Sequence, residues 1–286
     1  MNKIHRIIRA DIMGYCMGVR RAVEAAEQAL LDSPLRPVYT YGPLIHNPSA
    51  LERLSAAGVV IIGPGYASVP QHFSGKSVII RAHGIPPVEK SELLKREALI
   101  VDATCPRVLS SQKRAKSYFD KGFTVILAGD RNHGEISGIA GYAPGCILLE
   151  SREDAQRITE WPQKAVLISQ TTIKQSEYDS IAEVLSSHIT DLIVLDTICP
   201  ATVERQKALT ELAQLVDGIL VVGGKESANT KRLFHSAKQL CPMSWLVETA
   251  DDIPPEVFEL SCIGITAGAS TPDEVIDAVE QALQNV

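Results

Sequence analysis

Three cysteines occupy similar places in the chain and could share one metal centre. The run IVDATC ends at Cys105, the run IVLDTIC ends at Cys199, and a looser version, IIRADIMGYC, ends at Cys16. The cysteines lie 89 and 94 residues apart. Each apolar run, expected to be a buried strand, passes through an aspartate into the cysteine, and a helical pattern follows. Three such turns, each presenting one thiol, predict three ligands of a single metal site.

The identity of the metal depends on the number and softness of its ligands. Three thiolates fit either a zinc ion or an iron–sulfur cluster. Four-iron clusters are usually held by four cysteines, so a three-cysteine cluster would leave one iron open to substrate. Structural zinc ligands normally lie close together in sequence, and a spacing of about 90 residues favours the cluster. A zinc site with three cysteines and one histidine, and a chain without metal, are the competing interpretations.

The remaining cysteines, Cys146, Cys241 and Cys262, adjoin apolar or helical segments and are expected to be structural thiols. Six cysteines in 286 residues are too few for a disulfide scaffold. A net charge of −6 argues against nucleic-acid or anionic-membrane partners. No apolar run approaches the ~18 residues of a membrane span, and Arg9 and Asp11 interrupt any signal-peptide core, so a cytoplasmic location is expected.

Strand and helix patterns repeat three times along the chain. From each cysteine to the polar residue of the next turn there are 30, 28 and 28 residues, and from that turn to the following one 37, 38 and 43. Apolar strands that alternate with helices predict small parallel sheets flanked by helices. We therefore expect an α/β fold of three related units, residues 11–101, 102–195, and 196–286 together with 1–10, around a common centre. One or two doubly wound domains are the alternative.

Polar side chains follow the expected strands where parallel α/β sheets bind ligands. They are His46 and His83 in the first unit, His133, Glu135 and Thr171 in the second, and Ser227, Asn229 and Ser270 in the third. Each turn also opens a helix, whose unpaired N–H groups favour an anion, and an acid such as Glu135 can donate a proton. Taken singly, each residue could be a helix cap, a surface histidine or a solvated charge; their shared placement favours a common site.

Several common catalytic motifs do not occur. The sequence has no Gly-x-x-x-x-Gly-Lys-Ser/Thr phosphate loop, no Gly-x-Gly-x-x-Gly fingerprint and no Gly-x-Ser-x-Gly elbow. Nucleotide hydrolysis, direct nicotinamide binding and serine hydrolysis therefore lose support.

The combination of motifs resembles one known family over essentially the whole chain. The segments GYCMGV (14–19), LIHN (44–47), RAHG (81–84), DATCP (102–106), QTT (170–172) and TAGAS (266–270) are similar to motifs of the 4-hydroxy-3-methylbut-2-enyl diphosphate reductase (IspH or LytB) family. The resemblance implies a pseudo-threefold cloverleaf around a central [4Fe-4S] cluster. It also implies reduction of that diphosphate to isopentenyl and dimethylallyl diphosphate, the last step of the non-mevalonate isoprenoid pathway. A ferredoxin- or flavodoxin-type protein would supply the electrons.

The resemblance also implies a role for each residue. Cys16, Cys105 and Cys199 would hold the cluster and leave one iron open. His46, His83, Ser227, Asn229 and Ser270 would bind the diphosphate, and His133 would line the pocket. Glu135 would deliver protons, and Thr171 would hold the substrate hydroxyl and assist the proton relay.

Two positions depart from the family pattern. Gly134 stands where the family often has proline, which is expected to loosen the turn, and Ala228 stands where some members have serine, which removes one hydroxyl.

The alternative from another functional class is a non-catalytic, zinc-bearing phosphate-binding module.

Overall fold

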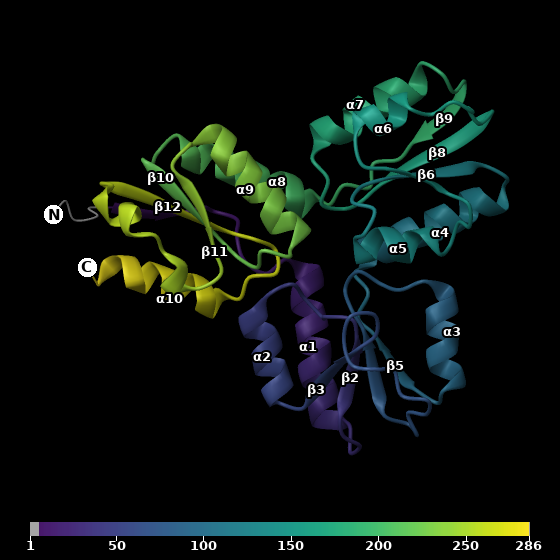
Figure 1. The fold of residues 1–286 in the computed structure, drawn as a ribbon, viewed down its shortest axis with the longest axis horizontal. Helices are drawn as coiled ribbons and strands as arrows, with labels where there is room; N and C mark the ends of the chain where they lie inside the picture. The colour runs from purple at the N-terminus through teal and green to yellow at the C-terminus, as the bar shows by residue number, and fades with distance from the viewer. Residues whose placement is uncertain (1–5, 286) are drawn as a thin grey trace. The chain divides into compact units, whose positions relative to one another are not determined.

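The computed structural model describes residues 6–285 and contains three four-stranded sheets, in which every strand pair is parallel (Figure 1). Sheet A has the order β1 (Arg6–Arg9), β12 (Cys262–Ala267), β10 (Gly218–Val222), β11 (Ser244–Val247). Sheet B has the order β3 (Val59–Ile62), β2 (Val38–Tyr41), β4 (Ser77–Ile80), β5 (Leu99–Asp102). Sheet C has the order β7 (Ile147–Leu149), β6 (Thr124–Ala128), β8 (Lys164–Ser169), β9 (Asp191–Val194).

The strand order is the same in all three sheets when each is traced from the strand that follows a cysteine. The first strand (β2, β6 or β10) lies between the second (β3, β7 or β11) and the third (β4, β8 or β12). The fourth strand (β5, β9 or β1) lies at the edge beside the third. The prediction of an α/β fold built from small parallel sheets is confirmed. The strand expected near residues 7–10 does complete the last sheet, because β1 pairs with β12; residues 1–5 lie outside the described part.

Contacts between Cα atoms divide the chain into two compact units. One unit contains the described residues up to Arg20, Ile45–Ala56 and everything from Pro200 onward, and it includes sheet A. The other contains Arg21–Leu44 and Ala57–Cys199, and it includes sheets B and C. The three predicted unit boundaries stay a prediction.

Helices cover the sheets because the strands are apolar on both faces. The helices are α1 (Met17–Asp32), α2 (Pro48–Ala56), α3 (Pro87–Lys95), α4 (Pro106–Asp120), α5 (Gly134–Ala140), α6 (Arg152–Gln156), α7 (Gln175–Ser186), α8 (Pro200–Ala213), α9 (Ala228–Leu240) and α10 (Asp273–Gln284), with short 3-10 turns at Ala250–Asp252 and Pro255–Glu259. On sheet C, α4 and α5 pack on one face through Ala115, Ile136 and Ile139, and α6 and α7 pack on the other. On sheet A, α8 and α9 share one face and α10 covers the other.

The strands that lead into the cysteines are not the buried strands that the sequence predicted. β1, β5 and β9 each have exposed first and last residues and only partly buried middle residues. Each is an edge strand and pairs with one neighbouring strand only. Its other edge has no strand beside it, so the side chains remain partly exposed although the run is apolar. The fully buried strands are the central ones, such as β10 and β4.

No helix among residues 6–285 is long and apolar enough to cross a membrane.

Tyr178 of α7 joins the end of β8 to the segment after β9. Its hydroxyl donates to the carbonyl oxygens of Leu167 (3.0 Å) and Leu195 (2.7 Å), and the side chain is 2% exposed. We expect Tyr178→Phe to lower the free energy of unfolding by about 0.5–1.5 kcal/mol, because the buried Leu167 carbonyl and the partly buried Leu195 carbonyl lose the hydroxyl proton that they share. Urea unfolding followed by circular dichroism measures the change, with Tyr66→Phe, an exposed tyrosine, as control. Equal stabilities of the two variants would show that this hydroxyl does not stabilise sheet C.

Candidate functional site

Each of the three predicted cluster cysteines makes an equivalent backbone hydrogen bond. In each case the cysteine N–H donates to a carbonyl in the loop that follows the third strand of the same sheet. Cys105 donates to Ala82 (2.9 Å), Cys199 to Thr171 (2.9 Å) and Cys16 to Ala269 (3.1 Å). The loop after the edge strand is therefore joined in every sheet to the loop that carries a predicted ligand-binding residue.

Each of these cysteines also stands directly before a helix. Cys105 is the N-terminal cap residue of α4, Cys199 precedes Pro200 of α8, and Cys16 precedes Met17 of α1. None is in a disulfide, and all three are partly exposed. A helix N-terminus favours the negatively charged thiolate, which is the form that binds metals.

The other cysteines have different surroundings. Cys241 is 8% exposed, and its thiol donates to backbone carbonyls. Burial raises the pKa of the Cys146 thiol, and desolvation likewise raises the pKa of Cys262. The raised pKa values of Cys146 and Cys262 disfavour their thiolate forms, in keeping with the expected structural role.

The loops after the first and third strands meet where the strand order reverses. In doubly wound sheets this switch point is where ligands bind, beyond the carboxyl ends of the strands. In sheet C, His133 follows β6, Glu135 lies in the first turn of α5, and Thr171 follows β8. In sheet A, Ser227 follows β10, Asn229 lies in the first turn of α9, and Ser270 follows β12. The topology therefore places the predicted polar residues at the two ligand-binding positions of each of these sheets.

Two hydrogen bonds join Glu135 to Thr171. The Thr171 N–H donates to Oε1 of Glu135 (2.7 Å) and the Thr171 hydroxyl donates to Oε2 (2.8 Å). Glu135 is 1% exposed and Thr171 is 8% exposed. Because the Thr171 carbonyl accepts the Cys199 N–H, one residue connects a buried carboxyl group to a cysteine turn.

His133 is the N-terminal cap of α5. Its Nδ1 accepts the Glu135 N–H at 3.2 Å, so the neutral ring carries its proton on Nε2. The His83 and His133 rings lie edge to face with centroids 4.7 Å apart. The turn of sheet C and the RAHG loop of sheet B are thus in direct contact within one compact unit.

The other compact unit gathers most of the residues predicted to bind diphosphate. The Ser270 hydroxyl donates to the His46 carbonyl at 3.3 Å. Gly224 also lies against that carbonyl, because a Cβ at position 224 would be 3.0 Å from the His46 carbonyl carbon. Ser227 caps α9 by accepting the Thr230 N–H. Nδ2 of Asn229 is buried and has no hydrogen-bond partner within the described chain, which leaves an N–H donor for a ligand.

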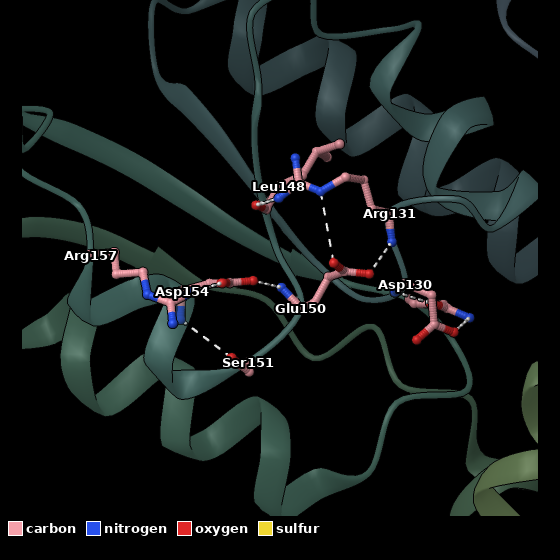
Figure 2. Close-up of polar contacts among 8 residues, drawn as sticks. Asp130, Arg131, Leu148, Glu150, Ser151, Asp154 and Arg157 are labelled. Atoms are coloured by element: carbon pink, nitrogen blue, oxygen red, sulfur yellow. Dashed lines mark hydrogen bonds and ion pairs between the residues drawn. The ribbon is translucent and has the colours of Figure 1, made fainter.

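A glutamate positions the turn before each capping residue (Figure 2). In sheet C, Oε1 of Glu150 accepts the Arg131 N–H (2.9 Å), and the Glu150 N–H donates to Asp154 (3.0 Å). Sheet A repeats both bonds: Glu248 accepts the Lys225 N–H (2.8 Å) and its own N–H donates to Asp252 (2.9 Å). Arg131 and Lys225 each lie two residues before the cap, His133 or Ser227.

Asp102 stabilises the turn that presents Cys105. Its Oδ1 accepts the Thr104 N–H (3.1 Å) and hydroxyl (2.6 Å), and Lys90 pairs with its Oδ2 at 2.6 Å. Partial desolvation opposes ionisation, but the bonds from Lys90 and Thr104 outweigh it and lower the pKa of Asp102. Asp102, three residues before Cys105, therefore has a structural function in the turn that presents this cysteine.

Gly134 makes room for the partly buried Arg81. A Cβ at this position would lie 2.8 Å from Cζ of Arg81 and closer still to Nη2. Burial lowers the pKa of Arg81, which also lies against Gly42. Gly134 is the first residue of α5, directly after the His133 cap. Because glycine has no side chain, the Arg81 guanidinium group occupies the space that the Cβ of a proline would need. At the other departure, Ala228 is the first residue of α9, and the capping hydroxyl of Ser227 is retained.

Sequence reasoning missed the supporting residues Glu150, Glu248 and Arg81. A signal existed for the two glutamates, because each directly follows a second strand and precedes an aspartate by four residues. Arg81 belongs to a motif used for the resemblance, but only the structure places it against Gly134.

Comparisons with known proteins agree with this arrangement. Residues 7–284 match the family described as LytB protein. A protein of Treponema denticola named 4-hydroxy-3-methylbut-2-enyl diphosphate reductase is 50% identical over 284 residues, which cover 96% of this chain and 98% of that protein.

Two solved structures have the same fold. The E-1-hydroxy-2-methyl-but-2-enyl-4-diphosphate reductase of Plasmodium falciparum superposes with a TM-score of 0.89 and 28% identity, covering 98% of this chain and 88% of that chain. A second structure, described as (E)-4-hydroxy-3-methyl-but-2-enyl diphosphate reductase, the terminal enzyme of the non-mevalonate pathway, has a TM-score of 0.71 and 36% identity, covering 98% and 99%. Because residues 7–284 match the family and the relatives cover nearly all of the chain, the chain belongs to the LytB protein family.

Proposed function

We propose that this chain is a 4-hydroxy-3-methylbut-2-enyl diphosphate reductase. It removes the allylic hydroxyl of its substrate with two electrons and two protons, and yields isopentenyl or dimethylallyl diphosphate and one water. Family membership implies an iron–sulfur enzyme, and the named relatives support the substrate and the place in the non-mevalonate pathway. The zinc-bearing, non-catalytic alternative is not favoured, because the relatives reported above are named as reductases.

The hydrogen-bonded series Glu135–Thr171–Cys199 is the observation that carries the proposal. The Thr171 hydroxyl directs its proton to Glu135 and keeps lone pairs that can accept a bond from the substrate hydroxyl. When Glu135 is protonated, the direction of this bond can reverse and deliver a proton to the departing oxygen. The Thr171 carbonyl meanwhile holds the Cys199 turn, so proton delivery and the cysteine turn share one residue.

The anionic end of the substrate requires N–H and O–H donors. His46, His83, Ser227, Asn229 and Ser270 would supply them, with His133 lining the pocket. The buried and unpaired Nδ2 of Asn229 supports this role, since a buried donor normally has a partner. The start of α9 adds backbone N–H groups that favour phosphate oxygens.

Cys16, Cys105 and Cys199 would hold a [4Fe-4S] cluster with one iron open to substrate. Their equivalent backbone bonds, their position at helix starts and their lack of disulfides fit thiolate ligands. When bound, such a cluster supplies single electrons and a Lewis-acidic iron. The protein residues position the hydroxyl, hold the diphosphate and deliver protons.

We further propose a cytoplasmic location and a ferredoxin- or flavodoxin-type protein as electron donor. Both follow from the proposed reaction, which consumes two single electrons and a water-soluble diphosphate.

Metal analysis of anaerobically purified protein gives the first test. We expect about four iron and about four sulfide per chain, brown colour, and turnover of the diphosphate with dithionite and methyl viologen as reductant. One zinc per chain and no turnover would instead establish the phosphate-binding alternative.

The proton role predicts the behaviour of Glu135→Gln. The amide keeps the shape of the side chain but cannot donate an acidic proton, so we expect the iron content and substrate affinity to stay unchanged while kcat falls at least 10²-fold. Glu160→Gln, on the exposed loop before β8, is the matched control and should retain full turnover. Normal kcat in Glu135→Gln would exclude the proton role.

The ligand role predicts the behaviour of Cys105→Ser. Serine is a poor ligand for a soft iron site, so the variant should lose most of its iron and its visible absorbance. Cys146→Ser, in the same compact unit, should retain both. If Cys105→Ser keeps the native iron content, Cys105 is not a ligand.

A further inference from the structure

Helix α4 is strongly basic although the chain as a whole has a net charge of −6. It begins directly after Cys105 and carries Arg107, Lys113, Arg114 and Lys116, with Lys121 at its C-terminal end. All five cations are exposed, and Asp120 is the only acid of the helix.

Among the three helices that follow a cysteine, only α4 is strongly basic; elsewhere α9 is also basic, with Lys231, Arg232 and Lys238 and no acid. The two helices that follow the other cysteines balance their charges: α8 carries Arg205 and Lys207 against Glu204 and Glu211. In α1, two arginines stand against three acids. A basic helix is therefore not a requirement of the cysteine turn.

Stability does not explain the charge either. Only Lys116 has an acidic partner within the described residues, Asp120 at 2.9 Å. Arg107 lies in the first turn, where the helix dipole disfavours a cation. Lys113 and Lys116 are three residues apart on one face, where like charges destabilise a helix. Lys121 is stabilised locally, because it lies over the Tyr118 ring (5.4 Å to the centroid) at the helix C-terminus. Arg107 and Lys113 therefore carry the unfavourable charge that an anionic partner would offset.

Three of the five cations line an open hollow on the surface of the compact unit that contains sheet C. The hollow has a volume of about 380 Å³ and is lined by Lys113, Lys116, Ser117, Asp120, Lys121 and Tyr142. Phe119, on the same helix, is 40% exposed. Weak redox complexes have small interfaces, aromatic side chains are enriched at interfaces, and surface charge of one sign attracts a partner of the opposite sign.

The basic face is close to both cysteine turns of its compact unit. At 1.5 Å per residue, Lys113 lies about 12 Å along the helix from Cys105. Nη1 of Arg114 approaches the carbonyl oxygen of Asp196 at 3.5 Å, and Asp196 lies three residues before Cys199. Figure 1 shows α4 beside β6 and β8, whose loops carry Glu135 and Thr171.

Resting on the proposed function, we propose that the exposed face of α4, together with Lys121 and Tyr142, is the docking surface for an acidic one-electron carrier protein. Two reduced carriers each give one electron per turnover; the substrate takes both electrons and two protons and releases water. Complementary charge raises the rate of encounter and makes it depend on salt, whereas the affinity of such a complex stays low.

The test compares two charge-reversal variants of the cluster-loaded enzyme. Lys113→Glu/Lys116→Glu changes the α4 face, and Lys207→Glu/Lys238→Glu makes the same charge change on exposed residues of α8 and α9. Turnover is measured with methyl viologen, and separately with prereduced acidic ferredoxin and flavodoxin from which excess reductant has been removed.

We expect the α4 variant to keep its methyl viologen rate and to lose about tenfold or more in kcat/KM for the carrier at low salt. The difference should shrink at high ionic strength, where charges are screened. Equal carrier kinetics in the two variants would overturn the docking surface. The proposal would also be overturned if the native enzyme accepted electrons from methyl viologen but from neither carrier. It would likewise be overturned if the α4 variant lost only the ability to bind an oligonucleotide. A native enzyme inactive with methyl viologen contradicts the proposed function instead.

Discussion

One backbone hydrogen bond, made three times, organises the candidate site. The N–H of Cys16, Cys105 or Cys199 reaches the loop after the neighbouring third strand, at 2.9–3.1 Å. Because that loop also carries a predicted ligand-binding residue, the position of each thiol is coupled to the position of a polar side chain. The coupling follows from strand order alone: the edge strand always pairs with the third strand.

Much of this arrangement could be predicted from the sequence. The spacing of cysteines and polar turns predicted three copies of one strand–helix unit, and the apolar strands between helices predicted parallel sheets. Both features can be predicted because they depend on residue patterns that are local in the sequence. Burial of the cysteine-bearing strands was predicted wrongly. A run such as Leu99–Asp102 is equally apolar at an edge or in the centre of a sheet, and only the strand order decides how much of it is covered.

The rest depends on contacts between segments far apart in the chain. Glu150 and Glu248 hold the turns before His133 and Ser227 from the ends of other strands. Arg81 fills the space beside Gly134 from another sheet. A glutamate or an arginine after a strand has many uses, so its partner becomes visible only when the chain is folded. The predicted roles of the site residues remain to be tested by the variants described above.

The two capping residues have a further consequence for ligand binding. His133 and Ser227 occupy equivalent turns, and each uses one side-chain atom to bind the first turn of its helix. Their rotamers are therefore already restricted before any ligand arrives, and binding does not have to remove that rotational freedom. The entropy lost on ordering these side chains belongs to folding, so a ligand that meets them retains more of the favourable energy of its contacts.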